Sequence, residues 1–239
     1  MGHNVLYICG TDEYGTATEV KALKEGSSPR VICDHYHKLH KSIYEWFGIS
    51  FDHFGRTSTQ AHTDITQEIF RNLRDNGALE EKTSKQLHCG HCDLFLADRF
   101  VLGNCKKCGA ATRGDQCESC STIFNNPAEE LTSLACSVCG NSPSPRQTTH
   151  FYLNLAAQSG ALKEWLLGEG GMEGWSNNAK GVTRSWLNSP AEDRCITRDL
   201  RWGVPVPHPG YERKVFYVWF EAPIGYISMT AQILPEGYR

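Results

Sequence analysis

The sequence predicts an α/β fold in which a parallel, doubly wound sheet is interrupted by a small cysteine-rich insertion. Strand-like and helix-like segments alternate over residues 1–83, a pattern that favours parallel strands joined by helices. Four Cys-x-x-Cys pairs then fall within residues 84–150, where the helical periodicity fades. The alternation resumes over residues 151–239. We therefore expect three segments with these boundaries.

The first segment begins with a strand, a turn and a helix. Asn4 to Cys9 is a short apolar run of strand length, and Ala17 to Glu25 suits a helix after a glycine-containing turn. From Pro29 onward, apolar residues recur every three or four positions, which predicts a second helix with one apolar face. These residues are Ile32, Tyr36, Leu39, Ile43, Trp46 and Phe47.

The remaining elements flank the cysteine-rich segment. Before it, we expect a short strand at Phe51–Phe54 and a helix over Thr63–Leu73. After it, His150–Leu155 has a strand-like pattern, and Lys214–Phe220 is an apolar and aromatic run that predicts another strand. Two further helices are predicted at Leu162–Leu167 and Val182–Leu187.

Composition limits the function classes. The 239-residue chain has a net charge of −3, which argues against a protein that coats nucleic acid through excess Lys and Arg. No run approaches the ~18 apolar residues of a membrane span, and no cleavable signal precedes the first strand. We therefore expect a cytoplasmic protein with reduced thiols and no membrane partner. The unpaired Cys9, Cys33 and Cys195 are expected to be buried as small apolar residues.

The cysteine pairs predict two metal sites. Eight of the eleven cysteines lie in Cys-x-x-Cys pairs. Each pair can direct two thiolates at one point, and two pairs complete a tetrahedron around Zn²⁺. A disulfide framework is the rival interpretation, but the lack of a signal peptide opposes it. The pairs are Cys89/Cys92, Cys105/Cys108, Cys117/Cys120 and Cys136/Cys139.

The spacing leaves the grouping of these pairs open. Sequential grouping joins the first pair to the second and the third to the fourth, across gaps of twelve and fifteen residues. Nested grouping joins the two inner pairs to each other and the two outer pairs to each other. Interleaved grouping requires crossing connections and ranks last.

Four separated motifs occur in the order found in one enzyme family. They are Cys9–Thr16 (CGTDEYGT), Phe95–Val101 (FLADRFV), Ile196–Pro207 (ITRDLRWGVPVP) and Val215–Tyr226 (VFYVWFEAPIGY). Together they resemble methionyl-tRNA synthetase, closest to the eukaryotic cytosolic and archaeal type. The resemblance covers nearly the whole chain.

The resemblance implies a class I, Rossmann-like catalytic domain formed by residues 1–83 and 151–239, with the amino-acid pocket in the second part. A zinc-binding connective-peptide domain, residues 84–150, would separate the two parts. Family members with a single zinc suggest the nested grouping. The resemblance thus implies two structural zinc sites, one formed by Cys105, Cys108, Cys117 and Cys120 and the other by Cys89, Cys92, Cys136 and Cys139.

The resemblance also implies a reaction and its residues. Methionine and ATP give methionyl-adenylate and pyrophosphate, and the methionyl group is then transferred to tRNA(Met). Asp12 matches the residue that binds the ammonium group, and Arg198 matches a catalytic arginine near the active centre. Without the resemblance, Asp12 could equally cap a helix, and Arg198 would be half of a solvated ion pair. The methionine side chain would contact Trp219, Ala222, Pro223 and Tyr226.

The ATP-binding signatures of class I enzymes are missing from their expected places. His88–His91 (HCGH) and Lys82–Lys85 (KTSK) imitate the HIGH and KMSKS motifs, but in reversed order at the start of the insertion. We interpret both as chance, and His88 and His91 as surface residues. We expect the chain to begin after the first signature, to stop before the second, and to form no adenylate alone. ATP, Mg²⁺ and membership of a multi-synthetase complex are implied only for the full-length protein.

Two other functions compete with this interpretation. A zinc-ribbon module derived from a synthetase could bind nucleic acid or protein through a basic surface, although five dispersed charges are usually a solvated face. A thiol–disulfide oxidoreductase uses a single Cys-x-x-Cys at a helix N-terminus, which four pairs in loops oppose. The basic residues are Arg99, Lys106, Lys107, Arg113 and Arg146.

Overall fold

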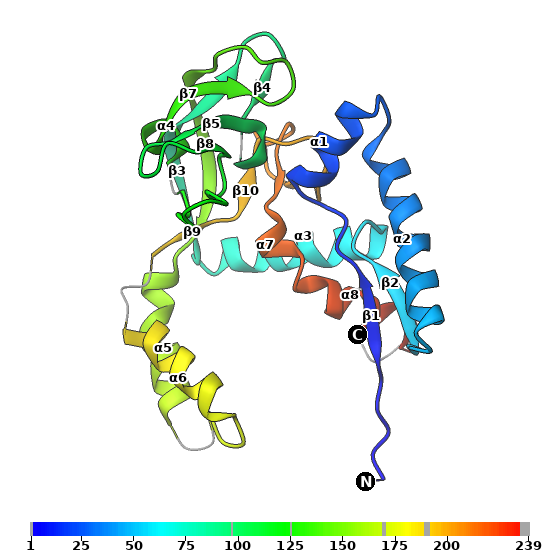
Figure 1. Ribbon diagram of the computed structural model, residues 1–239. Coiled ribbons are helices and arrows are strands. Elements are labelled where there is room, and N and C mark those ends of the chain that lie inside the picture. Colours follow the sequence, from blue (N-terminus) through cyan, green and yellow to red (C-terminus); the bar gives the residue numbers. More distant parts are fainter. Residues whose placement is uncertain (1, 97, 125, 169–170, 189–191, 235–239) are drawn as a thin grey trace.

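Two short parallel strands, β1 and β2, form the base on which the candidate cleft is built. The computed structural model describes residues 2–96, 98–124, 126–168, 171–188 and 192–234. β1 pairs with β2 from Ile8↔His53 to Thr11↔Arg56, and two helices join the strands as in a βαβ unit. The helices α7 and α8 return from the far end of the chain to lie beside the strands (Figure 1). The bounds are β1 Ile8–Thr11, α1 Thr16–Lys24, α2 Pro29–Trp46, β2 His53–Arg56, α3 Gln60–Asp75, α7 Val218–Glu221 and α8 Ile224–Ile233.

Local sequence signals start α2 and α3. The Ser28 hydroxyl accepts a hydrogen bond from the N–H of Val31 at 3.3 Å, and Pro29 occupies the first turn. Thr59 caps α3 in the same way, through the N–H of His62 at 3.2 Å. His62 is therefore held in the first turn of α3, where its side chain is buried.

Two glycines let α8 pack directly on the strand pair. A Cβ on Gly55 would lie 2.8 Å from Met229 Cγ, and a Cβ on Gly10 would lie 2.7 Å from the Gly55 carbonyl oxygen and also meet Met229. No side chain fits at either position. The strands and α8 therefore approach closely, and Met229 of α8 packs against both glycines.

The cysteine-rich insertion grows out of a long antiparallel pair, β3 and β8. These strands pair from Leu79↔Leu153 to His88↔Ser144 within a sheet of order β4-β3-β8-β9, and a second sheet has the order β6-β5-β7. The expected boundaries at residues 84 and 150 fall inside β3 and β8, so the three-segment division stays a prediction. The bounds are β3 Leu79–Cys89, β4 Leu94–Phe95, η1 Asp98–Phe100, β5 Val101–Cys105, β6 Ala111–Arg113, α4 Pro127–Glu130, β7 Leu131–Cys136, β8 Ser144–Leu153 and β9 Arg194–Cys195.

After β8, two helices project from the body of the molecule (Figure 1). These helices, α5 and α6, expose several large apolar side chains, including Trp165 and Trp186. The chain then returns through the antiparallel pair β10 and β11, which leads into α7. The bounds are α5 Leu155–Leu167, α6 Asn177–Asn188, β10 Thr197–Arg198 and β11 Val215–Phe216.

Two buried clusters hold these parts together. One surrounds the cysteine pairs and also contains Val20 of α1 and Val215 of β11, so the insertion shares a core with the body. The other centres on Phe70 of α3, whose ring lies 5.1 Å from the rings of both Phe151 and Phe216. No helix in the described part of the chain is long and apolar enough to cross a membrane.

The mixed α/β class is confirmed, with local differences from the prediction. Parallel pairing is limited to β1 and β2 among the described strands, and the other ladders are antiparallel. The strand predicted at Asn4–Cys9 begins only at Ile8, because its partner β2 begins at His53. The strand predicted at Phe51–Phe54 is likewise shifted toward Arg56.

The predicted strand Lys214–Phe220 is wrong beyond Phe216, where the chain turns into α7. A short apolar run fits a strand or a buried helix equally well, so periodicity could not decide. The helices predicted before and after the insertion are confirmed. α3, α5 and α6 are longer than expected, whereas α1 and α2 have about the predicted lengths. The apolar face predicted on α2 is present but largely exposed at Leu39, Ile43, Trp46 and Phe47.

Candidate functional site

A cleft of about 640 Å³ opens between the end of β1 and the helices α7 and α8. Among the described residues that line the cleft, Asp12 alone carries a charge, and most of the others are apolar or glycine. The structure therefore brings together all five residues expected to contact methionine. The lining consists of Ile8, Cys9, Gly10, Asp12, Thr57, Val218, Trp219, Ala222, Pro223, Gly225, Tyr226 and Met229.

The backbone of α7 and α8 explains the wall of the cleft. Ala222 and Pro223, between the two helices, also have helical backbone angles, with φ of −56° and −64°. The chain therefore follows one helical path from Val218 to Ile233. Residues 219, 222, 223 and 226 recur at intervals that place them on a single helical face, and this face lines the cleft.

Asp12 lies in the turn directly after β1, at the end of the strand where open α/β folds bind ligands. Its carboxylate is accessible through the cleft, yet the surrounding protein removes much of its water, and this desolvation raises its pKa. The nearby His62 and a backbone hydrogen bond from Tyr14 act in the opposite direction. Asp12 is therefore an accessible carboxylate at the edge of the cleft, and its negative charge suits it to pair with a cation.

Arg198 does not line this cleft. Its guanidinium carbon lies 3.7 Å from the centre of the Tyr217 ring, and Nη1 donates to the Thr197 carbonyl at 3.0 Å. It lines a second cavity, between the insertion and β8, together with Lys85 and Tyr152. Because Tyr217 immediately precedes α7, Arg198 is next to the cleft but outside it, and its catalytic role stays a prediction.

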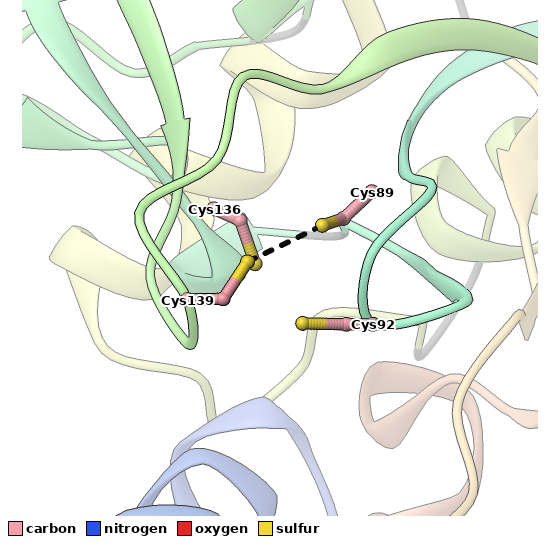
Figure 2. Close-up of side chains that lie close together, drawn as sticks. All are labelled: Cys89, Cys92, Cys136 and Cys139. Atoms are coloured by element: carbon pink, nitrogen blue, oxygen red, sulfur yellow. Dashed lines mark hydrogen bonds between the residues drawn. The ribbon is translucent and has the colours of Figure 1, made fainter.

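The eight paired cysteines gather as two groups of four sulfur atoms in the nested arrangement. Within each group the sulfur atoms lie within 4.8 Å of one another. Figure 2 shows the outer group, in which the side chains from two distant segments point toward one common centre. The groups are Cys89, Cys92, Cys136 and Cys139, and Cys105, Cys108, Cys117 and Cys120.

The distances in both groups fit a tetrahedral zinc site. Zn–S bonds of about 2.3 Å give sulfur–sulfur edges of about 3.8 Å. The sulfur atoms of Cys89 and Cys139 are 3.5 Å apart, and the corresponding distance in the inner group is 3.8 Å between Cys105 and Cys120. Hydrogen bonds from Thr122 lower the pKa of the Cys120 thiol to about 6, whereas the neighbouring thiols of the same group raise the pKa of Cys108.

Each cysteine pair ends in the same backbone turn. The residue after the second cysteine has a positive φ in all four pairs: 46° at Asp93, 76° at Gly109, 58° at Ser121 and 77° at Gly140. In three of the pairs, the N–H of this residue donates to the carbonyl of the first cysteine at 2.8 Å. This turn directs both sulfur atoms of a pair to one side. The glycines after Cys108 and Cys139 are its sequence signal.

Several expectations for single residues need correction. His88, expected at the surface, is buried against Phe95, with a ring distance of 4.9 Å, and lies 3.3 Å from the Asp93 carboxylate. Its position in β3, which pairs with both β4 and β8, accounts for this burial. Cys33 is buried as expected, but Cys9 and Cys195 are only partly buried, because Cys9 lines the cleft and Cys195 lines the cavity that contains Arg198.

The structure also contains polar clusters that the sequence analysis missed. His62 lies between Glu221 and Ser228 behind the cleft. His150 and Asp199 form a second buried pair. The partners in both pairs are far apart in the sequence, so no local pattern could identify them.

Comparison with known proteins identifies the family. The model of the family described as tRNA synthetases class I (M) matches residues 1–238. The chain belongs to this family. Among the relatives of this class I synthetase chain is a probable methionine–tRNA ligase from Oryza sativa subsp. japonica, 52% identical over 98% of this chain and 30% of the relative. The cytoplasmic methionine–tRNA ligase of Homo sapiens is 53% identical over 99% of this chain and 26% of the relative.

The class I synthetase chain therefore spans less than a third of the length of these relatives. A solved structure with a similar fold is Mycobacterium tuberculosis methionyl-tRNA synthetase in complex with methionyl-adenylate. The two align with a TM-score of 0.65 at 18% identity, over 100% of this chain and 41% of that chain. The class I synthetase fold is thereby confirmed.

Proposed function

We propose that this chain forms the methionine-binding part of a methionine–tRNA ligase. The observation that carries the proposal is the convergence of one carboxylate, Asp12, with an apolar and aromatic wall in a single cleft. Methionine presents an ammonium group and a thioether side chain, and these two kinds of surface match them. The names of the relatives and the methionyl-adenylate in the similar structure support the same substrate.

The residues of the cleft would act by positioning the substrate. Asp12 would hold the ammonium group, while Trp219 and Tyr226 enclose the thioether and keep water away. Adenylate formation requires an existing carboxylate to be oriented and phosphate charge to be stabilised, so a catalytic base is not needed. Arg198 is proposed to contribute charge from the neighbouring cavity, where the Tyr217 ring holds its guanidinium.

Both cysteine groups are proposed to hold structural Zn²⁺. Four thiolates at these distances close the tetrahedron and leave no coordination position for a reacting water. Bound zinc would link segments that are separate in the sequence, and metal binding and ordering are coupled in small modules of this kind. The two sites together would fix the insertion over the body of the enzyme.

The wider assignments follow from the family. The complete protein would use ATP, Mg²⁺ and tRNA(Met), and act in the cytoplasm, as the name of the human relative indicates for that protein. No described residue is proposed as a ligand of Mg²⁺. Membership of a multi-synthetase complex would likewise be a property of the full-length protein.

Calorimetric titration of this chain with L-methionine tests the proposal. We expect binding that weakens about 100-fold in Asp12→Ala, because a desolvated ammonium without its carboxylate loses several kcal/mol. Trp219→Ala should selectively reduce the preference for methionine over smaller aliphatic amino acids. The exposed Asp64 on α3 provides a control, and Asp64→Asn should change nothing. Equal binding of methionine and alanine by the unmodified chain would contradict the proposed substrate.

A further inference from the structure

The wall of the cleft depends on a part of the molecule that does not line it. Trp219 and Tyr226 are 77% and 64% exposed, so the core does not fix their rings directly. Their positions follow from the helical path of α7 and α8 that carries them. The opposite face of the same path contains two buried polar side chains, Glu221 on α7 and Ser228 on α8.

One imidazole connects both of these side chains to α3. Nε2 of His62 lies 2.6 Å from Oε2 of Glu221, and Nδ1 lies 3.0 Å from the hydroxyl of Ser228. All three side chains are fully buried. Because the capping residue Thr59 holds the backbone of His62 in the first turn of α3, the ring is a fixed point against which α7 and α8 are placed.

The hydrogen bonds of this cluster require a defined proton arrangement. The Ser228 hydroxyl donates to the Gly225 carbonyl at 3.0 Å, so its oxygen accepts from the Nδ1–H of His62. Nε2 of the same ring faces Oε2 of Glu221 at hydrogen-bonding distance. The other carboxylate oxygen of Glu221 is buried and has no hydrogen-bond partner within the described residues. Glu221 therefore depends on His62 for its polar contact, and losing that contact would leave a buried carboxyl group unsatisfied.

We infer that His62 is a positioning residue for amino-acid recognition, which sets the wall of the cleft relative to Asp12 through Glu221 and Ser228. The choice of methionine as the ligand rests on the proposed function. The claim that His62 fixes the position of α7 and α8 does not depend on it. The same ring also lies close enough to Asp12 to favour the charged carboxylate. His62 thus influences Asp12 on one side of the cleft and the α7–α8 wall on the other, although His62 itself does not line the cleft.

A matched pair of variants separates positioning from a general loss of stability. His150 is as buried as His62 and also has side-chain partners, Thr197 at 2.9 Å, Asp199 at 3.0 Å and Thr148 at 3.4 Å, but it does not line the cleft. We expect His62→Ala to weaken calorimetric methionine binding by about 10-fold or more, and His150→Ala by less than about 2-fold at a temperature where both are folded. Equal effects of the two variants would overturn the inference.

Two conservative variants test the two connections separately. An Asn side chain places its amide near the position of Nδ1 and a Gln side chain near that of Nε2, so His62→Asn can reach Ser228 and His62→Gln can reach Glu221. We expect both to bind methionine more tightly than His62→Ala. No recovery in either variant would contradict the assigned contacts.

Amide hydrogen exchange tests, without any ligand, whether His62 fixes the position of α7 and α8. His62→Ala should accelerate exchange over residues 218–233 by about 10-fold or more, and His150→Ala should leave this segment unchanged. If the unmodified chain bound no methionine, the proposed function would fail, while this comparison would still decide whether His62 fixes α7 and α8. Unchanged exchange over 218–233 in His62→Ala would overturn the inference.

Discussion

The Asp199 carboxylate shows how burial and hydrogen bonding oppose each other at a single residue. Burial alone would raise its pKa, but bonds from His150, Lys214 and Thr148 outweigh this effect and hold the pKa at about 2. Burial also lowers the pKa of His150. A neutral His150 ring can donate from Nε2 to Asp199 and accept at Nδ1 from Thr197. Lys214 is then the cation that balances the carboxylate.

This arrangement predicts a defined pH dependence of stability. A carboxylate with a lowered pKa in the folded state stabilises the protein above its unfolded-state pKa, and this contribution is lost as the pH falls toward the folded-state value. We expect Asp199→Asn to lower the free energy of unfolding by about 2 kcal/mol at pH 7. The difference from the unmodified chain should shrink as the pH falls from about 4 toward 2.

Urea denaturation at several pH values measures this difference. Asp64→Asn, at an exposed position on α3, serves as the control and should differ little from the unmodified chain at any pH. A destabilisation of Asp199→Asn that stayed constant below pH 4 would show that the carboxylate is not held in its charged form as described.

At the scale of elements, the turn that ends each cysteine pair is the feature that repeats. All four pairs place a residue with positive φ after the second cysteine, although only two of these residues are glycine. For other residues this conformation costs roughly 1–2 kcal/mol, less for Asp and Asn, whose side chains can bond locally. Asp93 and Ser121 therefore adopt an unfavourable conformation directly after the pairs Cys89/Cys92 and Cys117/Cys120.

Gly140→Ala should weaken the outer cysteine group for this reason. With φ at 77°, an added Cβ strains the turn and is expected to lower the free energy of unfolding by about 1 kcal/mol or more, and to speed the transfer of zinc to a chromophoric chelator. Gly90, between Cys89 and Cys92, offers the matched control because a Cβ there meets open space. Equal zinc release from Gly140→Ala and Gly90→Ala would contradict the role of the turn.

At the scale of the whole molecule, the two cysteine groups connect different parts of the structure. The inner group closes a local loop beside β5 and β6, whereas the outer group joins the end of β3 to the end of β7. The outer group therefore ties the second sheet to the sheet that contains β3 and β8. Around it lies the buried cluster that also includes Val20 and Val215. If both groups hold zinc as proposed, metal loss from the outer group should consequently affect the rest of the chain more than metal loss from the inner group.

Elemental analysis of the purified chain should give two zinc ions per chain. Cys108→Ser should release one ion, because it removes a ligand of the inner group only, and should leave the outer group intact. Cys195→Ser, a partly buried cysteine outside both groups, is the control and should retain both ions. One zinc or fewer in the unmodified chain, with freely titrating thiols, would refute the two-site proposal.

Methionine-dependent pyrophosphate exchange tests the chain as a whole. The 239 residues contain neither a HIGH nor a KMSKS motif in the class I position, and the loss of even one preorganised charge-stabilising group commonly costs ~10²–10³ in rate. We therefore expect methionine binding without useful adenylate formation. Robust pyrophosphate exchange by this chain would contradict this expectation, because other residues of the chain would then have to bind the phosphates of ATP.

The sequence alone determined the local features of this chain, which depend on residues close to one another in the sequence. The Cys-x-x-Cys spacing identified the segment whose eight cysteines form two groups that could hold metal ions, and the glycines after Cys108 and Cys139 are the sequence signal for two of its turns. The intervals between Trp219, Ala222, Pro223 and Tyr226 fixed which side chains share a face once the segment is helical. Whether it is helical was not determined, because a short apolar run satisfies both periods.

Only the tertiary structure decided which distant residues meet. The cysteine spacing permitted three groupings, and the nested one results from the way the two sheets bring the ends of β3 and β7 together. His62 and Glu221 are separated by 159 residues, and no local signal links them. Such contacts depend on the closure of long loops and on the packing of α8 against Gly10 and Gly55. Local patterns therefore specify the parts of this cleft, and packing specifies their assembly.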